Sequence, residues 1–148
     1  RDLPAVRSTV KFVFFWSMCV AAVFMVMYGL FGRQVLYVFT SDHDVVAASM
    51  EFIPWLIPMP LVGCAAFTWD GIYVGATASR PIRNSSIWAM AGFFAVWFIT
   101  HGMTRTAISG NPAIAVHILL AAFLIHLIIR FIYETLLYRR SILEEPFK

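Results

Sequence analysis

One acidic side chain lies deep in an apolar stretch of the sequence, where it could take part in ion transfer. Asp70 is the single formal charge between Phe52 and Ser79. An ionised carboxylate at membrane depth is costly and usually marks an ion or substrate pathway. Arg80 follows ten residues later, about 15 Å along a helix, so a boundary at Arg80 places Asp70 near the middle of a bilayer. The alternative is a structural acid that pairs with a hydroxyl group or an arginine on a neighbouring helix.

Two further polar residues share the helical face of Asp70. Tyr73 and Thr77 follow it at offsets of three and seven, so the three side chains are the candidates for a substrate or ion pathway. Gly71 and Gly75 form a small-xxx-small pair on the same helix. Such a pair allows close approach of another helix, and we expect a role in helix packing.

Metal or cofactor chemistry is not expected from the remaining reactive side chains. His117 and His126 are nine residues apart, which is about 180° around a helix, so they cannot form one local ligand pair. Cys19 and Cys64 lie in apolar runs, where free thiols act as small apolar side chains. The sequence has no Ser-His-Asp order, HExxH, CxxC or glycine-rich phosphate loop, so we expect no enzyme, no cofactor and no metal.

The composition places these residues in a membrane protein. The chain of 148 residues is 61% hydrophobic and 13% charged, with a mean hydropathy of +0.80, whereas soluble domains have roughly 45–50% apolar and about 25% charged residues. A soluble domain of this size could not bury so many apolar side chains. The net charge of +3 does not indicate a nucleic-acid partner, because the basic residues lie at the ends of apolar runs.

The spacing of charges predicts an all-α polytopic membrane protein with four transmembrane helices. The spans cover approximately residues 12–32, 52–78, 84–104 and 112–132, and residues 133–148 form a cytoplasmic tail. Pro54, Pro58 and Pro60 should bend or break the start of the second span. Asn111 and Pro112 should begin the fourth as a cap and a first-turn proline.

Basic residues are distributed unequally over the two sides of these spans. Nine lie on the side of the termini (Arg1, Arg7, Lys11, Arg80, Arg83, Arg130, Arg139, Arg140 and Lys148), against Arg33 and Arg105 on the other. The positive-inside rule therefore predicts that both ends of the segment are cytoplasmic. The expected location is the inner (plasma) membrane. The chain opens without an initiating Met, so we expect it to be part of a longer protein.

The second span resembles a known transporter family. The runs Phe52 to Leu56, Phe67 to Thr77 and Arg83 to Ser85 look like the C-terminal lobe of the multidrug and toxic compound extrusion (MATE) transporters. Within that family they are most similar to the DNA-damage-inducible-F-like branch, whose tenth helix carries an Asp-Gly-Ile-Phe-Ile-Gly-Ala-Thr type of motif. Asp70 falls at the aspartate of this motif, which implies a buried acid of the C-terminal lobe.

The resemblance implies helices nine to twelve of a twelve-helix bundle with two six-helix lobes, so the chain would be part of one lobe, four of its six helices. It implies a secondary active antiporter that exports organic cations, drugs or metabolites in exchange for protons or sodium. The expected partners are the lipid bilayer, the N-terminal lobe of the same chain, a small organic substrate and the coupling ion.

Other functions remain open. The chain could form a small four-helix exporter that works as an oligomer with Asp70 as its essential acid. It could instead be a non-transporting helical membrane subunit or scaffold whose Gly71 and Gly75 face packs on a partner. A membrane enzyme is the least favoured, because no nucleophile, base and metal ligands converge in the sequence.

Overall fold

A computed structural model describes residues 2–104, 108 and 110–144 of the chain. Its regular elements in that part are all helical: α1 (Leu3–Phe39), α2 (His43–Ser49), η1 (Met50–Phe52), α3 (Ile53–Leu56), α4 (Met59–Gly75), α5 (Ser79–Met103), α7 (Ala113–Tyr138) and η2 (Arg139–Glu144). Three helices are long and apolar enough to cross a bilayer, and a fourth span results if the bent pair 43–56 and 59–75 is one span. The predicted all-α membrane fold is confirmed.

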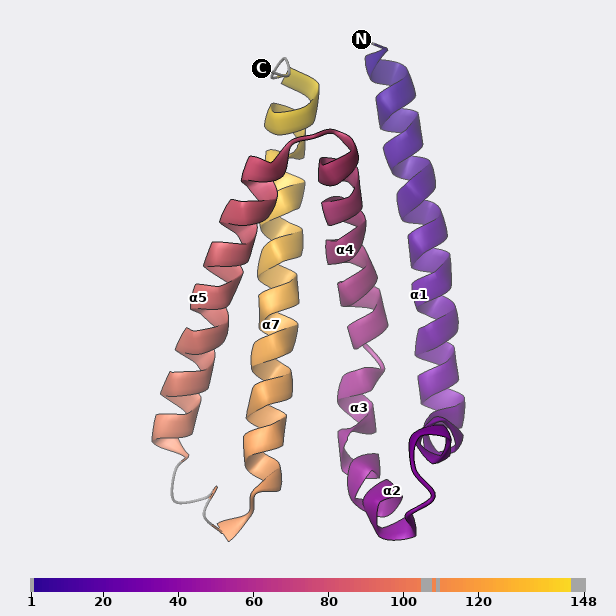
Figure 1. The fold of residues 1–148 in the computed structure, drawn as a ribbon, viewed down its shortest axis with the longest axis vertical. Helices are drawn as coiled ribbons and strands as arrows, with labels where there is room; N and C mark the ends of the chain where they lie inside the picture. Colours follow the sequence, from indigo (N-terminus) through magenta and orange to yellow (C-terminus); the bar gives the residue numbers. More distant parts are fainter. Residues whose placement is uncertain (1, 105–107, 109, 145–148) are drawn as a thin grey trace.

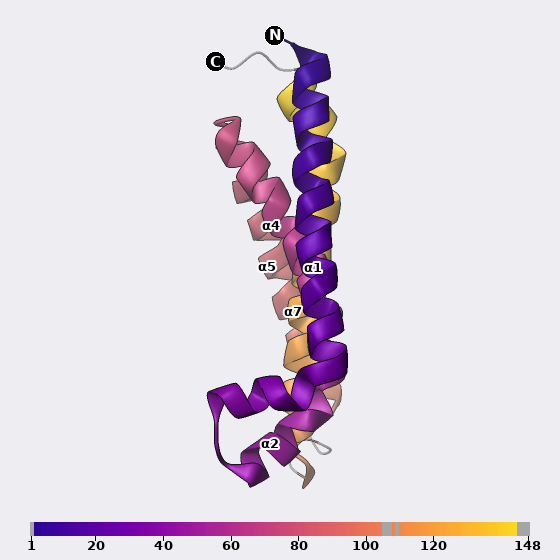
Figure 2. The ribbon, with the colours of Figure 1, turned by 90° about the vertical axis from the view of Figure 1, so that its right-hand side faces the viewer.

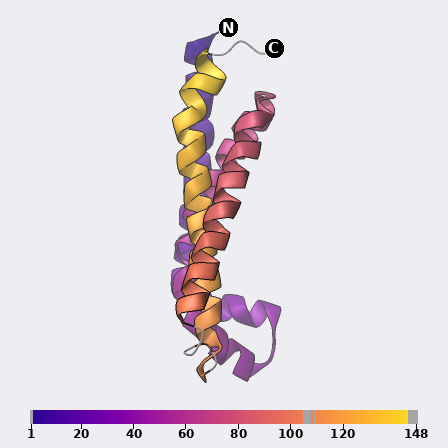
Figure 3. The ribbon, with the colours of Figure 1, turned by 90° about the vertical axis from the view of Figure 1, so that its left-hand side faces the viewer.

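Successive long helices run in opposite directions along the chain, and in space they lie in the order α1, α4, α7, α5, so that the neighbours α4 and α7 run in the same direction (Figure 1). α4 and α5 are consecutive in sequence, yet α4 packs mainly on α1 and α7. α7 therefore lies between α4 and α5 and contacts both of them. α5 is inclined to α7, and the two helices cross at an angle (Figures 1 and 3). The α4–α7 interface is thus the centre of the described bundle.

The second span is broken where the prolines predicted a bend. The segment 43–56 and α4 meet at an angle of 53°. Pro58 is the N-cap of α4 and Pro60 lies in its first turn, positions where the missing amide hydrogen does least harm. On one side of the break α3 contacts α1, and on the other side α4 packs along both α1 and α7.

Local capping explains where several helices begin. Asp2 accepts a hydrogen bond from the backbone N–H of Ala5 at 3.2 Å and starts α1. Asp42 accepts from Asp44 and Val45 and starts α2, as the polar run before it predicted. α1 loses helical geometry at Phe31 (φ −119°, ψ 19°), and its last turns bend away toward α2 (Figure 2).

Basic side chains gather at one end of the bundle. The start of α1, the α4–α5 turn and η2 lie together at that end, and the α1–α2 connection lies at the other (Figure 1). The first group carries Arg7, Lys11, Arg80, Arg83, Arg139 and Arg140, and the opposite end carries Arg33. Arg1, Arg105 and Lys148 belong to the same expectation but lie outside the described residues.

The C-terminal part differs from the sequence expectation at Arg130 and Glu134. We expected Arg130 among the cytoplasmic cations and a solvated tail from residue 133 onward. Instead α7 continues to Tyr138, and Glu134 has an exposed fraction of 0%. The hydrogen bonds of Glu134 with Tyr73 of α4 and Ser85 of α5 show that this stretch of α7 packs against both helices.

Candidate functional site: an arginine and two acids between α4, α5 and α7

The ion pair at the centre of the site joins α4 to α7. Arg130 donates from Nη2 to Oδ1 of Asp70. The side chains are 12% and 22% exposed, respectively, so the pair is largely removed from solvent. The guanidinium group also lies over the ring of Phe67, 5.9 Å from its centroid. The structural alternative for Asp70, a pairing with an arginine on a neighbouring helix, is the geometry that is observed.

A second acid approaches the same arginine from one turn further along α7. Oε1 of Glu134 lies 3.8 Å from Nε of Arg130, which is too long for a hydrogen bond. The same oxygen is 2.5 Å from the hydroxyl oxygen of Ser85 on α5. Ser85 and Glu134 are both fully buried. One arginine therefore faces two carboxyl groups, and a buried serine contacts the second of them.

Tyr73 is part of the interface with α7. Its hydroxyl group donates to the backbone carbonyl oxygen of Glu134 at 2.6 Å, and its side chain is fully buried. One turn earlier, Trp69 donates from its indole N–H to the hydroxyl of Thr135 at 2.8 Å. These two bonds fix the axial position of α4 along α7. Tyr73 therefore supports the Asp70 and Glu134 cluster from the side.

Thr77 lies in the turn between α4 and α5. Its φ of 55° is in the left-handed region. The N–H of Ala78 bonds the carbonyl of Tyr73 at 2.9 Å, which is the arrangement of a Schellman cap with Thr77 in the position usually taken by glycine. The Thr77 hydroxyl donates to the carbonyl of Ala76 at 2.7 Å. Its polar group is thus directed at its own turn.

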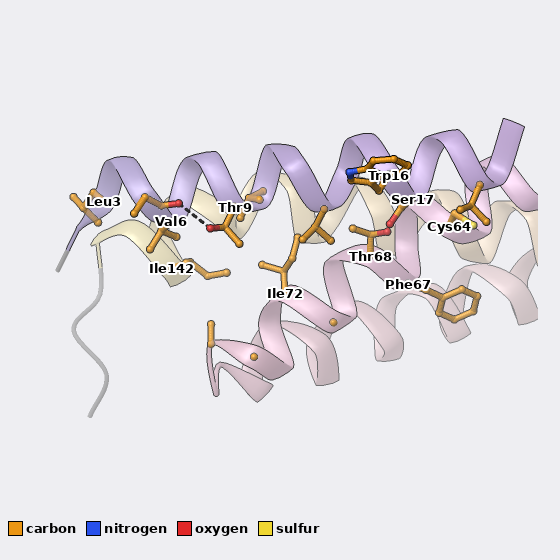
Figure 4. A pocket seen from close by; sticks show the side chains of 17 residues that line it. Leu3, Val6, Thr9, Trp16, Ser17, Cys64, Phe67, Thr68, Ile72 and Ile142 are labelled. Carbon is orange, nitrogen blue, oxygen red and sulfur yellow. Dashed lines mark hydrogen bonds between the residues drawn. The ribbon is translucent and has the colours of Figure 1, made fainter.

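Gly71 and Gly75 face an apolar groove between α1 and α4 (Figure 4). The groove has a volume of about 1010 Å³, and its lining includes Trp16, Cys64 and Phe67. A Cβ atom built at either glycine meets nothing within 4 Å. The described helices therefore do not use this small-residue face for packing, and Asp70 is not part of the groove lining.

A second polar cluster lies at the opposite end of α7. Trp55 of α3 donates from its indole N–H to Nδ1 of His117 at 2.8 Å. Nε2 of His117 lies 3.1 Å from a carboxylate oxygen of Glu51. An indole N–H only donates, so Nδ1 must accept and the imidazole hydrogen must be on Nε2, facing Glu51. This cluster holds the first half of the broken span, residues 43–56, against α7.

The described residues contain no group of three or more histidine, cysteine, aspartate or glutamate side chains that could hold a metal ion. His117 is bound by Trp55 and Glu51. Cys19 and Cys64 are free thiols. The arrangement that can bear chemistry is the Asp70, Arg130 and Glu134 cluster, which can exchange a proton or rearrange an ion pair.

Sequence reasoning found Asp70 and missed its partners. From the sequence, we expect Arg130 among the cytoplasmic cations at the end of the fourth span and Glu134 in the tail, because the segment from Arg130 onward is more polar than the run before it. A signal was present: the two residues have i, i+4 spacing, and Phe131, Ile132 and Tyr133 between them continue the apolar run. Ser85 had no signal, since the hydroxyl of a single serine does not identify its acceptor.

Comparison with known proteins defines the class. The MatE family model matches residues 1–96, and the helices and their hydropathy are those of a multi-pass membrane protein. The chain belongs to the MatE family, which is a family of membrane transporters. The predicted resemblance is confirmed.

The chain is similar to DNA damage-inducible protein F of Escherichia coli (strain K12), with 34% identity over 74 residues. That stretch is 50% of this chain and 16% of the relative. No solved structure matches the chain. The range matched by the family includes α4 with Asp70 and ends before α7, so Arg130 and Glu134 lie beyond it.

Proposed function

We propose that this chain forms part of a secondary active antiporter that exports organic cations, drugs or metabolites in exchange for a coupling ion, with the proton favoured over sodium. Membership in the MatE family supports the transporter class. The observation that carries the coupling role is the Asp70–Arg130 ion pair, which joins two neighbouring helices inside the bundle. Ionisable residues within transmembrane segments are rare and commonly mark ion or substrate pathways, which supports this role.

The pair can act as a two-state contact. While Asp70 and Arg130 are paired, they hold α4 against α7; when a change of protonation within the cluster breaks the pair, the attraction is lost and the helices can shift. A ligand or ion changes a conformational equilibrium only by binding the two states unequally, and a proton that is bound in one state and released in the other supplies that difference. A proton suits this site better than sodium, because the cationic guanidinium group already occupies the Asp70 carboxylate.

We place the protein in the inner (plasma) membrane. Both ends of the segment would then lie on the cytoplasmic side. Support comes from the clustering of Arg7, Lys11, Arg80, Arg83, Arg139 and Arg140 at one end of the bundle. The partners of the segment would be lipid, the remaining lobe of the transporter, an organic substrate and the coupling proton.

One observation favours a second function. The apolar groove beside Gly71 and Gly75 is open in the described bundle, as a surface that packs on another helix would be. The segment would then be a structural subunit, and Asp70 would serve stability alone.

The test compares Asp70→Asn with wild type in the protein as the cell makes it, at matched membrane abundance. Export coupled to a proton gradient is measured in proteoliposomes with a fluorescent organic cation. The transporter proposal expects loss of gradient-driven export with substrate binding retained. Unchanged coupled export at equal abundance would refute the coupling role. A fall in abundance alone, with full export per molecule, would favour the structural subunit.

A further inference from the structure

The hydrogen count at Ser85 depends on the charge of Glu134. The Ser85 oxygen lies 2.8 Å from the carbonyl oxygen of Ile82 and 2.5 Å from Oε1 of Glu134. Serine has one hydroxyl hydrogen, and a carbonyl oxygen can only accept. Both contacts are hydrogen bonds at once only if Ser85 donates to Ile82 and Glu134 donates to Ser85. The observed geometry is therefore satisfied in full by a protonated Glu134.

The surroundings of Glu134 lead to the same conclusion. Its Oε2 is buried without a hydrogen-bond partner among the described residues, and so is Nε of Arg130. The guanidinium group of Arg130 is committed to Asp70 through Nη2. A buried carboxylate needs an opposite charge and several hydrogen bonds to remain ionised. The Arg130 cation lies 3.8 Å away, beyond hydrogen-bond distance, and the carboxyl group of Glu134 has one hydrogen-bond contact, with the Ser85 hydroxyl. That single contact suits a neutral carboxylic acid better than an anion.

We propose that Glu134 is a proton-binding site, and that binding and release of its proton decide whether Arg130 pairs with Asp70 or with Glu134. This inference rests on the proposed antiport function, because it assigns the coupling proton to the carboxyl group of Glu134 in the Asp70, Arg130 and Glu134 cluster.

The two states differ in proton count and in the partner of Arg130. In the protonated state, Glu134 donates to Ser85, Ser85 donates to Ile82, and Arg130 binds Asp70. On release, the proton leaves Glu134 for water and the Ser85 hydrogen turns toward Oε1. The new carboxylate then attracts Nε of Arg130, which lies 3.8 Å away and has no other partner among the described residues. Asp70 thereby loses the Arg130 guanidinium group as its partner and becomes available to a different cation.

Every element packed against Glu134 contributes a group to this equilibrium. α4 contributes Asp70 and the hydroxyl of Tyr73, and α5 contributes Ser85. α7 itself contributes Arg130 one turn earlier. On the same helix, Tyr133 directly precedes Glu134 and Tyr138 lies four residues after it. Since Tyr73 binds the backbone of Glu134 rather than its carboxyl group, this bond between α4 and α7 does not depend on the charge of that carboxyl group.

Infrared spectroscopy of the purified, intact transporter in lipid tests the site directly, because a protonated carboxylic acid has a carbonyl stretch that a carboxylate lacks. We expect such a band at neutral pH in wild type and its loss in Glu134→Gln, which preserves shape and hydrogen bonding. The exposed-acid control Asp44→Asn on α2 should keep the band. A band that persists unchanged in Glu134→Gln would overturn the proposal.

Two further variants keep the proposal testable if Glu134→Gln fails to fold. Ser85→Ala removes the acceptor of the Glu134 proton, so the band should shift to the frequency of a carboxyl group with a weaker hydrogen bond. Asp70→Asn frees Arg130 for Glu134 and favours the carboxylate, so the band should weaken at the same pH. No change in either variant would also overturn the proposal.

Transport assays separate this proposal from the proposed function. If proton-driven export is absent in wild type while the band titrates and depends on Glu134, the antiport function fails and the proton site stands. If wild type couples export to protons and Glu134→Gln couples equally well, the proton site fails and the antiport function stands.

Discussion

Arg130 and Asp70 are separated by 60 residues along the chain and form a direct ion pair between α7 and α4. Asp70 lies about 7.5 Å before the end of α4 at Gly75, and Arg130 lies about 12 Å before the end of α7 at Tyr138. Two helices thus place opposite charges at the same depth, with basic residues at the same end. A carboxylate inside an apolar bundle is tolerated here because its counter-charge is built into the adjacent helix.

Breaking the pair on one side should cost more than removing it entirely. Asp70→Asn leaves Arg130 without its direct partner, and we expect the free energy of unfolding to fall by about 3 kcal/mol. The double variant Asp70→Asn with Arg130→Gln should be less destabilised than the sum of the single variants, by at least about 1 kcal/mol. Unfolding curves in detergent for the four proteins measure this coupling. Additive effects would show that the two side chains do not interact.

Thr77 should behave as a turn residue. A left-handed backbone costs a residue with a side chain roughly 1–2 kcal/mol relative to glycine, so Thr77→Gly should raise the midpoint of thermal unfolding. Thr77→Val keeps the branched shape and removes the hydroxyl group bound to the Ala76 carbonyl, and should lower the midpoint slightly. Both variants should transport normally. Equal loss of transport in the two would instead place the Thr77 hydroxyl in the pathway.

The bond between Trp55 and His117 should stabilise the first half of the broken span, residues 43–56. Trp55→Phe removes the donor. His117→Leu removes the acceptor and leaves both the Trp55 N–H and the Glu51 carboxylate without their imidazole partner. We expect about 1–2 kcal/mol of destabilisation for His117→Leu and faster amide hydrogen exchange in α3. Exchange in α5 serves as the internal reference. Unaltered exchange in α3 would show that this bond does not hold the segment.

Gly92 should be required for the close packing of α5 on α7. A Cβ atom at this position would overlap the Cδ1 atom of Ile129. We expect Gly92→Ala to destabilise the protein by about 1–2 kcal/mol, and Ile129→Val, which removes that methyl group, to restore much of the loss. Gly102→Ala is the matched control, since nothing lies within 4 Å of a Cβ there. Thermal unfolding of Gly92→Ala, Ile129→Val, the double variant and Gly102→Ala would test this. A double variant no more stable than Gly92→Ala would contradict it.

The helices and the bend could be predicted because they depend on local patterns. Uncharged runs between basic residues mark the long helices, and Pro58 and Pro60 mark the break of the second span. Asp70 was found because a charge within an apolar run is conspicuous. These features require no knowledge of which helix lies next to which.

The partners of Asp70 could not be predicted in the same way, because they depend on the order of the helices in space. α7 lies between α4 and α5, and this brings Arg130 and Glu134 toward residues 60 and 49 positions earlier in the chain. Polarity near the end of an apolar run is typical of a helix that leaves the membrane. It is equally typical of a helix that carries a buried ion pair, and the position of the neighbouring helices decides between the two.

The proline break in the second span also determines how easily its two halves can move relative to each other. Pro58 and Pro60 have no amide hydrogen, so the carbonyl groups of Pro54 and Leu56 receive no helical hydrogen bond from them. Bending an intact helix requires such bonds to stretch or break. Here they are already missing, so the angle between α3 and α4 can change at little energetic cost, and α4 can respond to events at Arg130 while α3 stays anchored to His117.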